Sequence, residues 1–263
     1  MKTEIIYFSA TGTTKAIVTA ISKGLRGEVH FTDITLPEKR KDAIEIDCDL
    51  VIAAIPVYGE RIPHFLYDYL KNIHGNGTYL AAISVYGNIG FGISLEQWKR
   101  LAETNHFRLI AAGAFIGQHT YASREAPVAY GRPDESDIRE ARTFAEDIQK
   151  KLDTGDSKCP EIPKCTLPGF ITKLPDSGTR LLVRQPRINN RTACNNCGAC
   201  VRKCPVGAIN SETLEISENK CLRCYACVRV CPQKARTAGL RLSVFRTIFF
   251  HAGMSKKENQ IFL

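Results

Sequence analysis

Two groups of cysteines with identical spacing are the part of this sequence best suited to chemistry. The first group follows Cys-x-x-Cys-x-x-Cys-x-x-x-Cys-Pro and comprises Cys194, Cys197, Cys200 and Cys204. The second repeats that pattern and comprises Cys221, Cys224, Cys227 and Cys231. Three cysteines at such intervals let one loop wrap three corners of an iron–sulfur cube, and the fourth, before proline, ligates the other cube. The spacing therefore predicts two [4Fe–4S] clusters, with Cys231 completing the first ligand set and Cys204 the second.

Zinc is the alternative metal for cysteine ligands. Structural zinc sites usually pair two short Cys-x-x-Cys segments at a longer separation, whereas each run here holds four cysteines and ends at a proline. The pattern therefore favours iron–sulfur clusters. The remaining cysteines, Cys48, Cys159 and Cys165, lie outside the runs, and we expect them to be packing residues or surface thiols.

The positive charge of the chain is concentrated in its second half. The formal net charge is +9, and residues 151–263 hold 19 Lys and Arg against 8 Asp and Glu. Bound clusters and a bound phosphate would offset part of this excess. A nucleic-acid surface would need stacking aromatics among the basic residues, but Tyr225 is the only aromatic between Arg187 and Arg236. We therefore expect no nucleic-acid partner.

Compartment can be inferred from the cysteines and from two apolar segments. The N-terminus begins with a strand pattern rather than a secretory leader. The longest apolar tract, residues 240–250, contains Arg241 and Arg246 and is too short to cross a bilayer. Metal-ligating cysteines suit a reducing compartment. We expect a cytoplasmic protein of an anaerobe, with no membrane span.

The first 152 residues alternate strand and helix patterns. Apolar runs typical of strands lie at residues 4–9, 29–31, 50–55, 79–86 and 109–116. The last helix is expected over residues 134–152, with Ser136 as its N-cap. This alternation predicts a doubly wound parallel sheet, in which ligands bind beyond the carboxyl ends of the strands.

Three loops at that edge carry candidate ligand-binding residues. The first is rich in hydroxyls and small side chains, which suit an anion at a helix N-terminus, and comprises Ser9, Ala10, Thr11, Gly12, Thr13 and Thr14. The other two offer rings and glycine turns, and comprise Pro56, Val57, Tyr58 and Gly59, then Tyr86, Gly87 and Asn88. Tyr58 and Tyr86 are suited to stacking on a planar ligand, with ordinary packing at strand ends as the alternative.

Both halves of the chain resemble known families. Tyr7-x-Ser9-x-x-Gly12-x-Thr14 resembles the phosphate loop of flavodoxins, and the cysteine runs resemble bacterial two-cluster ferredoxins. Together they resemble a flavodoxin–ferredoxin fusion family. The resemblance implies a five-stranded α/β sheet of order 2-1-3-4-5 followed by a small α+β 2[4Fe–4S] domain. It also implies FMN, with its phosphate on the first loop, its ring between the other two, and the Gly59 carbonyl at a flavin nitrogen.

The expected domains follow from these patterns. We expect an FMN-binding domain over residues 1–152, a proline-punctuated connector over 153–187, a ferredoxin domain over 188–237 and a C-terminal tail over 238–263.

The cofactors predict an electron-transfer protein that passes electrons between the clusters and FMN and exchanges one- and two-electron currencies with redox partners. Basic residues near the ligands should favour reduced clusters and attract acidic, ferredoxin-like carriers; they are Arg191, Arg202, Lys203, Arg223 and Arg229. One alternative is a ferredoxin-fed, FMN-dependent reductase of a small organic acceptor. Another is a scaffold without FMN. A flavin face shielded by the loop 118–132 and the tail would favour the electron-transfer protein, whereas an open flavin face would favour the reductase.

Overall fold

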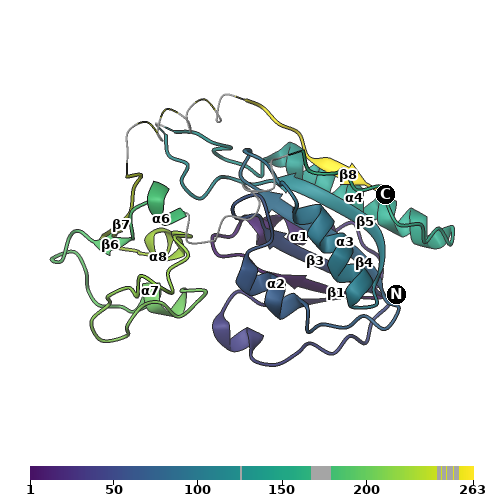
Figure 1. Cartoon of the computed structure of the whole chain (residues 1–263), viewed down its shortest axis with the longest axis horizontal. Coiled ribbons are helices and arrows are strands. Elements are labelled where there is room, and N and C mark those ends of the chain that lie inside the picture. The colour runs from purple at the N-terminus through teal and green to yellow at the C-terminus, as the bar shows by residue number, and fades with distance from the viewer. Residues whose placement is uncertain (125, 167–178, 242–243, 245–246, 248–250, 252–254) are drawn as a thin grey trace.

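A mostly parallel, six-stranded sheet forms the larger part of the molecule (Figure 1). The computed structural model describes residues 1–124, 126–166, 179–241, 244, 247, 251 and 255–263. The strands are β1 (Lys2–Tyr7), β2 (Glu28–Asp33), β3 (Leu50–Pro56), β4 (Tyr79–Tyr86), β5 (Arg108–Ile116) and β8 (Gln260–Phe262). Their order is β2-β1-β3-β4-β5-β8, and only the β8 pairing is antiparallel. The predicted order of the first five strands is confirmed, and β8 is an addition that the sequence patterns did not indicate.

Helices cover both faces of this sheet because its central strands are apolar on both sides. The first six residues of β3 are all buried. On one face α1 (Thr13–Ser22) and α4 (Glu135–Asp153) bury residues such as Ile17 and Phe144. On the other face α2 (His64–Leu70) and α3 (Ser94–Thr104) bury residues such as Leu66 and Trp98. Since every parallel strand ends at the same edge, the three candidate loops gather there.

The start of α4 differs from the prediction. Asp134, not Ser136, is the N-cap, because its carboxylate accepts hydrogen bonds from the amides of Ser136 at 2.9 Å and Asp137 at 3.1 Å. The Asp137 carboxylate accepts in return from the Asp134 amide at 2.8 Å, which completes a capping box.

A smaller unit holds the cysteines and lies to one side of the sheet (Figure 1). Its elements are short: α6 (Thr179–Leu182), β6 (Arg187–Ile188), α7 (Ala199–Arg202), α8 (Ala226–Arg229) and β7 (Arg236–Thr237). Antiparallel pairing of β6 with β7 closes the unit around both cysteine runs. A further short helix, η1 (Pro37–Arg40), belongs to the larger part and reaches toward this unit.

The end of the chain returns to the sheet. The Asn259 amide oxygen accepts a hydrogen bond from the Ile116 amide at 2.8 Å, and its nitrogen donates to Asp137 at 2.9 Å and Glu140 at 2.7 Å. The segment expected to be a tail thus contributes β8, beside β5 and α4 (Figure 1). Residues 167–178 of the expected connector and most of 242–254 lie outside the described residues. None of the described helices combines the length and apolar character needed to cross a membrane.

Candidate cofactor sites

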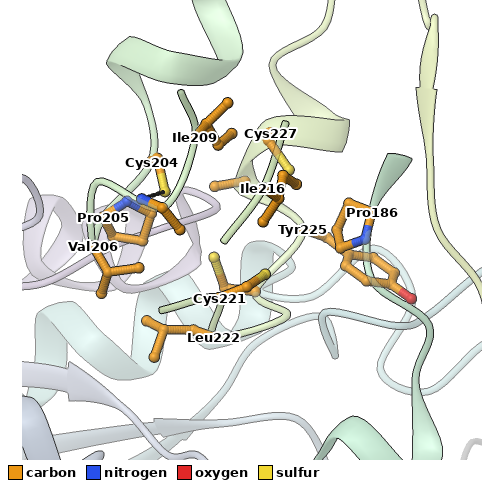
Figure 2. A pocket seen from close by; sticks show the side chains of 13 residues that line it. Pro186, Cys204, Pro205, Val206, Ile209, Ile216, Cys221, Leu222, Tyr225 and Cys227 are labelled. Carbon is orange, nitrogen blue, oxygen red and sulfur yellow. Dashed lines mark hydrogen bonds between the residues drawn. The ribbon is translucent and has the colours of Figure 1, made fainter. Parts of the chain in front are cut away.

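Four cysteines line one small cavity in the smaller unit. They are Cys204, Cys221, Cys224 and Cys227. Figure 2 shows Cys204, Cys221 and Cys227 reaching this space from different segments. This is the crossed set predicted for the second cluster, since Cys204 comes from the first run and the other three from the second. The predicted crossed set thus lines one shared cavity, an arrangement that a [4Fe–4S] cluster would use.

The walls of this cavity are apolar. Ile209, Ile216 and Leu222 line it beside the cysteines, and burial raises the pKa of the Cys224 and Cys227 thiols to about 12. Thiols with such pKa values are protonated at neutral pH unless a cation compensates for the lost solvation, and iron supplies that compensation when it binds the sulfur. The donor set and its surroundings fit a cluster.

The donors of the other predicted cluster are more accessible. Cys197 is exposed, and Cys194, Cys200 and Cys231 are half-buried. Burial acts to raise the pKa of Cys231, but the amides of Arg236, Ala235 and Gln233 outweigh it and lower the pKa. Among the residues described, no three His, Cys, Asp or Glu side chains converge closely enough to hold a single metal ion.

A buried arginine lies within the second cysteine run. Arg223 is 1% exposed, and its Nη2 donates to the Glu218 carboxylate. Its Nε and Nη1 have no hydrogen-bond partner among the described residues. Orphaned guanidinium donors next to Cys224 are what an anionic cluster would satisfy, because hydrogen bonds and positive charge compensate for buried negative charge.

The loop between β1 and α1 leaves part of the helix N-terminus without side-chain partners. The N-cap residue of α1, Gly12, has no side chain to cap the helix, and the first turn contains no acid, in contrast to the capping box of α4. The Ser9 hydroxyl accepts from the Lys15 amide at 3.1 Å, which fixes the loop around Gly12. An N-terminus left in this state attracts an anion through its amides and dipole. These residues fit the phosphate of FMN.

The loop after β3 makes a tight turn at the same edge of the sheet. Gly59 and Glu60 both have positive φ, at 58° and 64°, and the Tyr58 amide donates to the Arg61 carbonyl at 3.0 Å. Gly59 is exposed, and no described atom would lie within 4 Å of a Cβ added to it. Its backbone is thus accessible to a planar ligand, as expected for a flavin-edge contact.

The two candidate stacking tyrosines have different surroundings. Tyr86 is 3% exposed, packs edge-on against Phe91 at 5.5 Å, and donates to the Glu258 carbonyl at 3.4 Å. Its ring is therefore packed in the core, which favours the packing alternative, and its loop stays in the candidate site. Tyr58 instead lies near Cys224 and Tyr121, and burial followed by these neighbours raises its pKa well above the usual value.

The sequence patterns did not indicate how the loop 118–132 is used. His119 packs on Gly87, since a Cβ added to Gly87 would lie 2.4 Å from the imidazole Cδ2. Tyr121 contacts Tyr225 of the cysteine unit, with ring centroids 4.9 Å apart. These contacts join residues that are far apart in the chain, so no local sequence motif indicates them.

Comparison with known families and structures covers both units. A flavodoxin domain model matches residues 4–105, and a 4Fe-4S dicluster domain model matches residues 186–232. A flavodoxin from the domain Archaea is 16% identical, with a TM-score of 0.42, over 58% of this chain and 99% of that one. Oxidised flavodoxin 2 from Bacillus cereus is 18% identical, with a TM-score of 0.43, over 57% and 99%. A Fusobacterium nucleatum flavodoxin bound to flavin mononucleotide is 12% identical, with a TM-score of 0.40, over 57% and 98%. No curated protein matches the chain.

Proposed function

The chain is a flavodoxin–ferredoxin fusion, an electron-transfer protein of the FMN and [4Fe–4S] type, and we propose that it carries electrons between two clusters and FMN. FMN accepts one or two electrons and each cluster passes one, so a chain that holds both can convert between one-electron and two-electron transfer. The observation that carries the proposal is the four-cysteine cavity, whose lining residue Tyr225 contacts the loop that packs on Gly87.

The proposed ligand sets are crossed between the two runs. One cluster is held by Cys194, Cys197, Cys200 and Cys231, and the other by Cys204, Cys221, Cys224 and Cys227. The shared cavity of the second set supports this division. Arg223 and Arg236 are buried beside these ligands, and Arg236 Nη2 lies 3.8 Å from the Cys200 sulfur. Both guanidinium groups stabilise added negative charge.

The proposed FMN site uses the three loops at the carboxyl edge of the sheet. The segment 9–14 holds the phosphate with backbone amides and hydroxyls. Segments 56–59 and 86–88 flank the ring, with the Gly59 carbonyl at its edge and Tyr58 against it. We propose residues 1–152 as the FMN-binding unit, now with β8 added, and 188–237 as the cluster unit, joined by residues 153–187.

The loop after β4, residues 86–88, is covered by other parts of the chain, and this favours electron transfer over reduction of an organic substrate. Asn88 donates to the Ser255 carbonyl at 2.7 Å, and Lys257 donates to the Ile89 carbonyl. The His119 side chain packs against Gly87 of the same loop. An enzyme needs an open flavin face for its substrate, whereas electrons pass through packed protein.

The proposed partners are acidic, ferredoxin-like carriers. Arg191, Arg202 and Lys203 are exposed beside the first cysteine run, where positive charge steers an anionic protein more strongly at low salt. Eight thiolate ligands also favour the reducing cytoplasm as the working compartment.

Anaerobic titration of the purified chain tests the proposal. Reduced ferredoxin should bleach the cluster absorbance and then that of FMN, whereas NAD(P)H alone should reduce neither. Acid extraction should release FMN. A brown protein that releases no flavin would refute the FMN assignment and leave a scaffold or sensor. Turnover of a small organic acceptor at the rate of flavin reduction would instead support the reductase.

A further inference from the structure

The cysteine unit touches the sheet domain at a small number of specific contacts. The Tyr121 and Tyr225 rings lie 4.9 Å apart at an interplanar angle of 58°. Arg229 Nη2 donates to the Thr120 carbonyl at 3.4 Å. Tyr225 caps α8 directly after Cys224, and both residues line the cluster cavity. The contact therefore involves the wall of that cavity itself.

The same contact continues to the proposed flavin loops. The His119 and Tyr121 rings lie 5.2 Å apart, and His119 rests on Gly87. Burial and the charge of Arg229 lower the pKa of His119 to about 4, so its imidazole is neutral at pH 7. The rings of Tyr225, Tyr121 and His119 thus connect the cavity with the flavin loop that holds Gly87. Tyr58, from the second flavin loop, interacts electrostatically with Tyr121 and Cys224.

The two cysteine sets differ in exposure and in their contact with this group. Cys204 and Cys227 are 9% and 8% exposed and belong to the inner cavity, whereas Cys197 is exposed to solvent. Arg202, also exposed, donates to the Cys197 carbonyl at 2.9 Å. The first set thus includes the exposed cysteine, with positive charge beside it, whereas the cavity of the second set is lined by Tyr225, which contacts the sheet domain.

We propose that Tyr121 and Tyr225 form a junction that fixes the cluster of Cys204, Cys221, Cys224 and Cys227 beside the flavin loops. In that arrangement Cys204, Cys221, Cys224 and Cys227 would hold the inner cluster, on the side of the flavin loops, and Cys194, Cys197, Cys200 and Cys231 would hold the outer cluster, on the side open to a carrier. The clusters would supply one-electron transfer, with a reduced iron–sulfur carrier as the electron source and no bond made or broken. Tyr121 and Tyr225 are positioning residues. This inference rests on the proposed function and assigns an order to its cofactors.

The test compares holoprotein variants of Tyr121 that retain or lose the ring. Tyr121→Leu should increase deuterium exchange of the amides in residues 222–230 about tenfold, because a lost aromatic pair releases the docked segment. The rate of electron passage from flash-reduced clusters to FMN should also fall about tenfold, since a loosened junction lengthens the path. Tyr121→Phe keeps the ring and should restore both values.

Two further variants serve as controls. Tyr130→Leu removes an exposed tyrosine from the same loop and should change neither measurement. Arg191→Glu, at an exposed position beside the first cysteine run, should weaken reduction by an acidic carrier, a step that Tyr121→Leu leaves intact. If Tyr121→Leu shows the deuterium exchange and the internal electron-transfer rate of the wild type, the proposed junction is refuted. If the wild-type chain passes no electrons from clusters to FMN, both the proposed function and the assigned order of cofactors are wrong. The deuterium-exchange data alone then decide whether Tyr121 holds the cysteine unit against the sheet domain.

Discussion

The Pro205 carbonyl accepts a 2.6 Å hydrogen bond from the guanidinium of Arg40, which lies 165 residues earlier. Arg40 also donates to the Thr35 carbonyl at 2.7 Å and packs over the Phe65 ring at 5.3 Å. One side chain thus ties the sheet domain to the residue that follows Cys204. Because a guanidinium offers several donors in a fixed plane, it suits this bridging position.

Arg40→Lys should loosen this second contact between the units. An ammonium group cannot reach all the carbonyls at once, and losing about one hydrogen bond should raise deuterium exchange in residues 204–208 roughly fivefold. Arg100→Lys, on the exposed side of α3, is the matched control. Equal exchange in the wild type and Arg40→Lys would show that the units dock without Arg40.

Cys204→Ser should remove the cluster held mainly by the second cysteine run. The reason is the crossed ligand set, in which Cys204 shares its cavity with Cys221, Cys224 and Cys227. Iron analysis should show about half the wild-type content, and electron paramagnetic resonance should retain the signal of one cluster. Cys159→Ser, an exposed cysteine outside the runs, should keep both. Retention of the second-run cluster with loss of the other would contradict the crossed assignment.

Gly12→Ala should weaken FMN binding. Gly12 has a φ of 97°, which an L-residue adopts at a cost of about 1–2 kcal/mol, so the flavin dissociation constant should rise about tenfold. The comparison variant is Gly155→Ala, which has a φ of 70° and is equally unobstructed among the described atoms. It lies after α4, away from the loop. An equal change in FMN affinity for both variants would point to general destabilisation instead of a phosphate site.

Arg223→Gln should lower the reduction potential of the inner cluster. Removing a buried positive charge disfavours the more negative, reduced state, and a one-electron couple shifts by about 59 mV for each tenfold change in equilibrium. Lys220→Gln removes a charge that is exposed and screened by water, so its effect should be much smaller. Spectroscopic redox titration measures both. Equal shifts would mean that burial of Arg223 has no electrostatic consequence.

Local patterns in the sequence were sufficient to predict the five parallel strands of the sheet. Apolar runs such as residues 50–55 and 79–86 mark buried parallel strands, and the structure places β3 and β4 there. The cysteine spacing likewise predicts its own chemistry, since ligand geometry is set by short intervals. Because these features depend on neighbouring residues within one segment, they can be predicted from the sequence.

Features that depend on distant residues were not predictable in this way. β8 has only three residues and no strong strand pattern, and it forms because Asn259 meets partners on β5 and α4. Tyr86 is a residue type suited to stacking on a ligand, but its ring packs against Phe91 and the core. The Tyr121–Tyr225 contact joins loops of two units. Tertiary packing decided each of these outcomes.

The Asp137 carboxylate connects α4 with the returning strand and should make stability depend on pH. Burial acts to raise its pKa, but hydrogen bonds from Arg132, the Asp134 amide and Asn259 outweigh burial and lower it. A lowered folded-state pKa contributes stability above the unfolded value, near 3.8, and this contribution is lost as pH falls through the folded value. The wild type should therefore lose stability below about pH 4.

Asp137→Asn should reduce the free energy of unfolding at pH 7 by about 2 kcal/mol, because Arg132 loses a charged partner that is largely buried. Urea unfolding followed through the fluorescence of Trp98, the sole tryptophan, measures it. The gap between wild type and variant should narrow as the pH falls below about 4 and through the lowered folded-state pKa of Asp137, where the wild-type carboxylate becomes protonated. Glu135→Gln, a 98% exposed acid on the same helix, should give a curve parallel to the wild type. A constant gap for Asp137→Asn would show that its charge state contributes nothing to holding β8 and α4 together.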